Sequence, residues 1–228
     1  MKKKLFFSLL ILVLIFVLWR ISKSTTYQIL GEIYPKIDTT EKVVALTFDD
    51  GPNKNTYEIL AILKELGVKA TFFVNGAAME KNPLFSKAIV NEGHDLANHS
   101  YSHQRMVFKS YSFIKNEIER TDSLIHVAGF TKEITFRPPH QKKIFVLPYY
   151  LNKHNRKTIM ANLYPESYAE KPINADNMAK YVVDNIEPGS IILLHVMFRD
   201  ESAKAIRGIV EGLHQKGYTF KTVTELLQ

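Results

Sequence analysis

The fold is decided by the stretch Val43-Val44-Ala45-Leu46-Thr47-Phe48-Asp49-Asp50-Gly51-Pro52. Its apolar first half predicts a buried strand, and the Gly-Pro pair predicts a sharp turn directly after it. Two adjacent carboxylates, Asp49 and Asp50, therefore come at the end of a buried strand. Like charges side by side raise the cost of ionising both, and a nearby cation would relieve that cost.

From this stretch onward, strand-like and helix-like segments alternate to the end of the chain. The alternation predicts an α/β fold with a parallel sheet and helical crossovers, either open or closed into a barrel. The expected strands cover residues 42–48, 70–74, 95–98, 134–136, 158–163, 190–194 and 218–221. The expected helices cover residues 56–66, 83–92, 110–127, 144–154, 175–186 and 201–216, and a last helical turn closes the chain.

Ionisable residues directly follow four of the expected strands. They are Asp49, Asp50, His99, Arg137 and His195. In α/β barrels the carboxyl ends of the strands build the active site. The sequence therefore predicts that these side chains share one pocket.

His99 and His103 stand four residues apart in His-Ser-Tyr-Ser-His. At helical spacing residues i and i+4 lie on one face, so both imidazoles could reach one ion. Together with Asp50 they form a ligand set common for divalent metals with open positions, which leaves Asp49 free to act as a base. Taken singly, a surface histidine pair is often incidental, and an Asp-Asp-Gly-Pro run is often only a capped turn.

Arg137 and His195 carry weaker signals. Arg137 precedes Pro138-Pro139 on a stiff, extended segment, as either a solvated strand-end arginine or a fixed guanidinium that orients a carboxylate. His195 ends the apolar run Leu193-Leu194. A lone histidine there is more often a satisfied core residue than a catalyst, but the other motifs favour a catalytic role.

The bulk composition excludes several classes of protein. The chain has 228 residues, 46% of them hydrophobic, which suffices for one sizeable α/β domain and argues against disorder. It has no cysteine, which excludes disulfides, thiolate metal sites and cysteine nucleophiles. Five of the positive charges lie in residues 1–23, so the net charge of +7 falls to +2 for the rest of the chain. We therefore expect no nucleic-acid partner.

The N-terminus predicts a targeting or anchoring segment. Lys2, Lys3 and Lys4 precede an apolar run at residues 5–19, and Arg20 closes it. No small-residue cleavage site follows, which favours an uncleaved signal anchor in the cell membrane over a cleaved signal peptide. The lysines should stay cytoplasmic, with the domain outside the membrane; cleavage would make the protein secreted. The sequence divides into this segment (1–23), a tether (24–40) and a catalytic domain (41–228).

Four motifs together resemble the polysaccharide deacetylase family, the NodB-homology group of carbohydrate esterases. They are Thr47-Phe48-Asp49-Asp50-Gly51-Pro52, His99-Ser100-Tyr101-Ser102-His103, Arg137-Pro138-Pro139 and Leu193-Leu194-His195. They occur in the family's order and span most of residues 41–228. The resemblance implies a distorted (β/α) barrel and a divalent metal, usually Zn²⁺, with Co²⁺ or Ni²⁺ as alternatives.

The resemblance also implies a role for each matching residue. Asp50, His99 and His103 match the metal ligands, Asp49 the catalytic base, His195 the general acid and Arg137 the residue that steadies the base. His140 falls where the family usually has an aromatic whose backbone N–H helps to form the oxyanion hole.

Two motifs depart from the family pattern. The third usually continues with an aromatic and a glycine, where this chain has His140-Gln141. The fourth normally has acidic residues and a tryptophan, and its best match here is residues 161–168. Asn162 stands there where an aspartate is plausible, so either Glu166 supplies the charge or activity is reduced or redirected.

The expected activity is removal of N-acetyl groups from an amino-sugar glycan, such as peptidoglycan or an exported polysaccharide. Two alternatives stay open: a glycan-binding relative with weak or no catalysis, and a deacetylase acting on O-acetyl groups or on a lipid-linked sugar.

Overall fold

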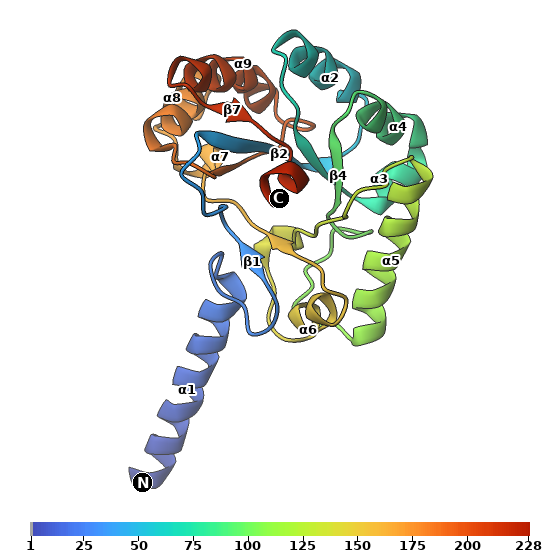
Figure 1. Ribbon diagram of the computed structural model, residues 1–228. Coiled ribbons are helices and arrows are strands. Elements are labelled where there is room, and N and C mark those ends of the chain that lie inside the picture. Colours follow the sequence, from blue (N-terminus) through green and yellow to red (C-terminus); the bar gives the residue numbers. More distant parts are fainter. Residues whose placement is uncertain (1) are drawn as a thin grey trace.

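A computed structural model describes residues 2–228 and contains a five-stranded parallel sheet (Figure 1). The strand order is β4-β3-β2-β6, and β7 pairs with β2. All the pairings are parallel, as the alternation of strands and helices predicts. The strands of this sheet are β2 (Val43–Gly51), β3 (Thr71–Val74), β4 (Asp95–Asn98), β6 (Ile191–Leu194) and β7 (Thr219–Phe220).

The sheet closes into a distorted barrel through single bridges. Phe136 bridges Asn98 of β4 on one side and Thr158 on the other, and Leu163 bridges Ile192 of β6. Thr158 begins β5 (Thr158–Ile159), which pairs with β1 (Ile33–Tyr34). The expected barrel is confirmed, but the expected strands at 134–136 and 158–163 are reduced to these short contacts.

Helices cover the outside of the sheet (Figure 1). They lie close to the expected ranges, and Ser110 caps α5 by accepting a hydrogen bond from the Phe113 N–H at 3.2 Å. The long ones are α2 (Thr56–Glu65), α4 (Pro83–Asn91), α5 (Tyr111–Val127), α6 (Val146–Lys153), α8 (Ala175–Asn185) and α9 (Asp200–Gln215). Three short helical segments were not predicted: α3 (Gly76–Lys81), α7 (Pro165–Tyr168) and the 3₁₀ turn η1 (Pro139–Gln141).

Strand β2 is buried along almost its whole length because it lies between two cores. Val44, Leu46 and Phe48 belong to the core between sheet and helices. Val43 and Ala45 alternate with them and belong to the barrel interior. Burial on both faces explains why the strand reads as a continuous apolar run.

The last helix, α10 (Val223–Leu226), closes the amino end of the barrel. The Val223 N–H donates to Thr71 Oγ1 at 2.8 Å, and Thr224 Oγ1 donates to Asp95 Oδ2 at 2.6 Å. Thr71 and Asp95 are the first residues of β3 and β4. The opposite, carboxyl end is therefore the end left for a site.

Helix α1 (Lys2–Lys23) projects away from the domain (Figure 1). It is long and apolar enough to cross a membrane, although a signal sequence would meet the same criterion. The following segment, predicted as a tether, contains β1 and packs on the domain. The Ile37 N–H, for example, donates to the Gly189 carbonyl at 2.9 Å. The division into anchor, tether and domain stays a prediction.

Candidate metal centre and active site

All seven residues singled out from the sequence gather at the carboxyl end of the barrel. Six of them line one cavity of about 520 Å³: Asp49, Asp50, His99, His103, His140 and His195. The seventh, Arg137, is fully buried directly behind Asp49. Parallel strands bring their carboxyl ends to the same edge, which is why residues far apart in sequence meet here.

Asp50, His99 and His103 form a compact cluster whose ligand atoms lie within 4.8 Å of one another. Asp50 Oδ1 is 3.1 Å from His103 Nε2 and 3.6 Å from His99 Nε2. This oxygen is buried, and it accepts no hydrogen bond from any side chain or backbone group in residues 2–228. A buried acceptor without a donor beside two imidazole nitrogens is what a cation site requires.

The tautomer of His99 also suits a metal. Its Nδ1 lies 2.8 Å from the Arg137 carbonyl, which can only accept, so Nδ1 carries the proton and the Nε2 lone pair faces Asp50. Burial lowers the pKa of His99. Burial and the neighbouring His140 lower the pKa of His103. Both rings are therefore held neutral, the form that binds a cation.

The two histidines converge through a turn, not through a helix as the four-residue spacing predicts. Ser100 and His103 have positive φ values of 67° and 56°, so the segment is not helical. The Ser100 N–H donates to Asn98 Oδ1 at 2.7 Å, and the His103 N–H donates to Ser100 Oγ at 3.1 Å. Glu117 of α5 accepts from Ser102 N–H and Oγ and holds the turn from behind.

Asp49 is buried against Arg137. The Arg137 Nη1 donates to Asp49 Oδ1 at 2.6 Å and to Thr47 Oγ1 at 2.9 Å. Nη2 donates to the Met160 carbonyl at 2.8 Å, and the guanidinium lies 3.9 Å from the centre of the Phe73 ring. Burial alone would raise the pKa of Asp49, but the charge and hydrogen bond of Arg137 together with the charges of His99 and His195 lower the pKa below the ordinary value of 3.8. Asp49 is thus an ionised carboxylate with one oxygen, Oδ2, left unbonded by Arg137.

Glu166, and not Asn162, pairs with His195. Glu166 Oε2 lies 2.6 Å from His195 Nδ1, and Oε1 accepts from the His195 backbone N–H at 2.6 Å. Burial alone would lower the pKa of His195, but the hydrogen bond with Glu166 and the charges of Asp49, Glu166 and Asp50 together raise it above 6.5. Asn162 instead bridges Ser190 and Ile191 outside the cavity. Of the two alternatives that the fourth motif left open, the structure therefore agrees with the one in which Glu166 supplies the charge.

The His140 loop contains two successive residues in the left-handed region. The φ values are 53° for His140 and 56° for Gln141. Gln141 stands where the family resemblance implies a glycine, and it adopts the backbone angle that glycine favours. The His140 ring lies 4.6 Å from the His103 ring, centre to centre. Gln141 therefore keeps the loop in a conformation that glycine would adopt more easily, at a cost in backbone free energy. His140 closes one side of the cluster.

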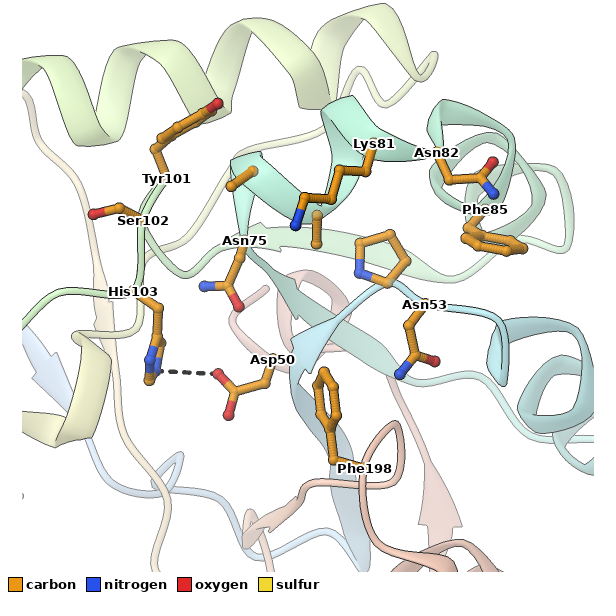
Figure 2. A pocket seen from close by; sticks show the side chains of 13 residues that line it. Asp50, Asn53, Asn75, Lys81, Asn82, Phe85, Tyr101, Ser102, His103 and Phe198 are labelled. Atoms are coloured by element: carbon orange, nitrogen blue, oxygen red, sulfur yellow. Dashed lines mark ion pairs between the residues drawn. The ribbon is translucent and has the colours of Figure 1, made fainter.

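A second cavity of about 510 Å³ continues from the metal cluster and shares Asp50, His103 and Phe198 with the first. Figure 2 shows Asp50 and His103 facing each other at one end, with Phe198, Lys81 and Phe85 along it. Aromatic faces, amide groups and one ammonium suit a ligand that has both apolar faces and polar groups. This wall was not predicted from the sequence, because α3 carries no periodic apolar pattern.

Comparison with known proteins agrees with this geometry. The family model described as polysaccharide deacetylase matches residues 36–158, more than half of the chain. The chain belongs to the polysaccharide deacetylase family. This deacetylase-family chain is 31% identical over 196 residues to a peptidoglycan-N-acetylmuramic acid deacetylase of Bacillus subtilis, covering 83% of the chain and 73% of the relative. It is also 31% identical over 212 residues to a peptidoglycan-N-acetylglucosamine deacetylase of Bacillus cereus, covering 87% and 94%.

Solved structures give the same family. A peptidoglycan N-acetylglucosamine deacetylase superposes with a TM-score of 0.77 at 32% identity, covering 84% of this chain and 90% of the other. A carbohydrate esterase family 4 pseudoenzyme from Bacillus anthracis superposes with a TM-score of 0.74 at 28% identity, covering 87% and 68%. The family therefore includes both deacetylases and at least one inactive relative.

Proposed function

We propose that this protein is a metal-dependent hydrolase that removes N-acetyl groups from an amino-sugar glycan outside the cytoplasm. The observation that most supports this proposal is the Asp50-His99-His103 cluster. The buried Asp49–Arg137 pair lies on one side of it and the His195–Glu166 pair on the other. The deacetylase relatives support the glycan substrate. The apolar helix α1 and the lysines before it support a membrane-anchored protein.

Asp50, His99 and His103 would hold a divalent ion, most often Zn²⁺ in this ligand class, which would supply polarisation of an acetyl carbonyl and a lowered pKa of water. Asp49 takes the role of general base. Its Oδ1 is held by Arg137, so Oδ2 accepts the proton, and Arg137 keeps the carboxylate ionised and correctly turned.

His195 takes the role of general acid. Its Nδ1 donates to Glu166, so Nε2 faces the cavity with the proton that the departing amine needs. The raised pKa of His195 keeps that proton available near neutral pH. The backbone N–H of His140 is the candidate donor to the oxyanion. The metal-binding cluster, Asp49, His195 and the backbone N–H of His140 thus cover the chemical requirements of amide hydrolysis.

The test compares two aspartate variants. Asp49→Asn should retain stoichiometric zinc by elemental analysis but lose about 10²- to 10⁴-fold in acetate release, the usual contribution of a general base. Asp50→Ala should lose both. The assays use peptidoglycan, N-acetylglucosamine oligomers and an O-acetylated xylan. Unchanged turnover in Asp49→Asn would refute the mechanism.

A second candidate is a glycan-binding relative without catalysis. It is favoured by the pseudoenzyme of similar structure and by the altered His140-Gln141 loop. Zinc-loaded wild-type protein that binds these glycans but releases no acetate from any of them would establish this candidate and refute the hydrolase.

A further inference from the structure

The end of helix α1 is built into the loop that carries His140. Lys143 is fully buried, and its ammonium donates to the Ser24 carbonyl at 2.5 Å. The Lys143 backbone N–H donates to the Ser22 carbonyl at 3.2 Å, and Ser22 is itself buried. The carboxyl-terminal end of α1 is therefore fixed against the active-site loop.

A third cavity, of about 290 Å³, opens at this junction. It is lined by Lys23, Thr25, Lys142, Tyr164, His140 and Gln141, among others. It shares His140 and Gln141 with the cavity that contains the metal cluster. A ligand at the metal cluster is thus separated by one loop from the last residue of the apolar helix.

The cavity carries positive charge without a counter-charge. Lys23 and Lys142 line it, and Arg105 lies near enough that burial together with the charges of Lys23 and Arg105 lowers the pKa of Lys142. In the part of the chain that the structure describes, no carboxylate oxygen lies within 4 Å of these three cations. An unpaired group of cations in a cavity favours an anionic ligand.

The position of the cavity indicates which kind of anion is expected to bind there. The apolar run of α1 ends at Trp19, and Lys23 follows four residues later, about 6 Å further along the helix axis. Lys23 Nζ lies 4.0 Å from the centre of the Trp19 ring. Tryptophan and lysine at this spacing are typical of the headgroup level of a bilayer.

We propose that this cavity binds the phosphate or pyrophosphate that links an amino sugar to a membrane lipid, while the sugar reaches the metal cluster past His140. The substrate class of the proposed deacetylase would then be a lipid-linked saccharide, so the inference rests on the proposed function. Ordinary anionic headgroups are a rival source of phosphate. They are disfavoured because a surface contact needs no cavity that joins the active site.

Binding is tested apart from catalysis. The full-length Asp49→Asn protein, in phosphatidylcholine vesicles with chelator, is titrated with N-acetylglucosamine pyrophosphate carrying a short prenyl chain. Binding is measured by isothermal titration calorimetry, because substituting Lys23, which lies over the Trp19 ring, would itself change tryptophan emission. We expect saturable binding that falls about tenfold in Lys23→Gln/Lys142→Gln, the range expected for two exposed ion pairs. Binding should be unchanged in Lys87→Gln/Lys115→Gln, which alters two exposed lysines on α4 and α5.

Activity is tested with two lipid-attached forms of one sugar, joined to the lipid either by pyrophosphate or by a neutral glycosidic bond. We expect wild-type kcat/KM to favour the pyrophosphate form by about tenfold, a preference lost in Lys23→Gln/Lys142→Gln. Equal rates on both forms, or a rise on both when phosphatidylglycerol is added, would overturn the inference in favour of headgroup contact. Wild-type protein that binds the pyrophosphate-linked sugar but releases no acetate from it would refute the proposed function and leave the binding site proposed here standing.

Discussion

The buried ion pair between Asp49 and Arg137 makes the sharpest prediction about stability. Both side chains are almost completely buried, and their atoms approach to 2.6 Å. Removing either partner leaves an uncompensated charge in the interior, which typically costs about 3–5 kcal/mol. We therefore expect Asp49→Leu and Arg137→Met each to lower the free energy of unfolding by about 4 kcal/mol.

The double variant Asp49→Leu/Arg137→Met should lose no more stability than either single variant, because it buries no unpaired charge. The expected coupling is then at least about 4 kcal/mol, measured by urea denaturation of the detergent-solubilised full-length chain at pH 8 with chelator. Losses that add to within about 0.5 kcal/mol would refute the reasoning. The exposed pair Arg207–Glu65, at a similar distance of 2.6 Å, serves as control and should show almost no coupling.

Further predictions concern the general acid, a buried histidine and the segment after α1. Glu166→Gln should reduce kcat for acetate release about 10- to 100-fold with zinc content unchanged, because His195 loses a charged hydrogen-bond partner. An unaltered kcat would contradict the assigned role. Burial lowers the pKa of His94 to about 4. Because protonation of His94 is favoured in the unfolded chain below pH 6.5, the free energy of unfolding should fall by at most roughly 3 kcal/mol as the pH drops from 6.5 toward 4. His94→Gln should flatten that decline in denaturation midpoints, and an equally steep decline would exclude this group as its cause. Deleting residues 1–38 should destabilise the domain far more than deleting residues 1–19, because only the longer deletion removes β1 and the carbonyl partners of Lys143. Equal thermal midpoints would contradict this.

The sequence predicts the buried parts of the fold well. Strands β2 and β6 begin within one residue of the expected positions, because a strand buried on both faces reads as a continuous apolar run. Strand β4 occupies the expected residues. Helices α5 and α9 show amphipathic periodicity and also lie within one residue of expectation. Where burial dictates composition, the pattern is strong enough to locate the element.

Short elements held by tertiary contacts are missed. Strand β1 is two residues long and exists because it pairs with β5, so it has no pattern of its own. Strand β5 was expected at residues 158–163 but is only two residues long. Helix α3 begins at Gly76, where a Cβ would lie 2.5 Å from the Tyr101 ring and 2.6 Å from Thr121 Oγ1. That glycine is required by close packing, a constraint that only the folded chain reveals.

The predicted site residues do lie together, but partly through a local geometry other than the one expected. The His99–His103 spacing suggested a helix, whereas side-chain hydrogen bonds to the backbone of a turn bring the rings together. The sequence left open whether Glu166 supplies the charge beside His195 or whether that charge is missing, because a single sequence cannot tell which residue of a loop faces inward. Its pairing with His195 depends on α7, which has no sequence signal.

The final helix makes the chain vulnerable at its very end. Asp95 is fully buried, and its Oδ2 accepts from both the N–H and the hydroxyl of Thr224. Deleting residues 223–228 would remove these donors and uncover the amino end of the barrel. Such a deletion should therefore leave little folded protein, although the metal cluster lies at the opposite end of the barrel.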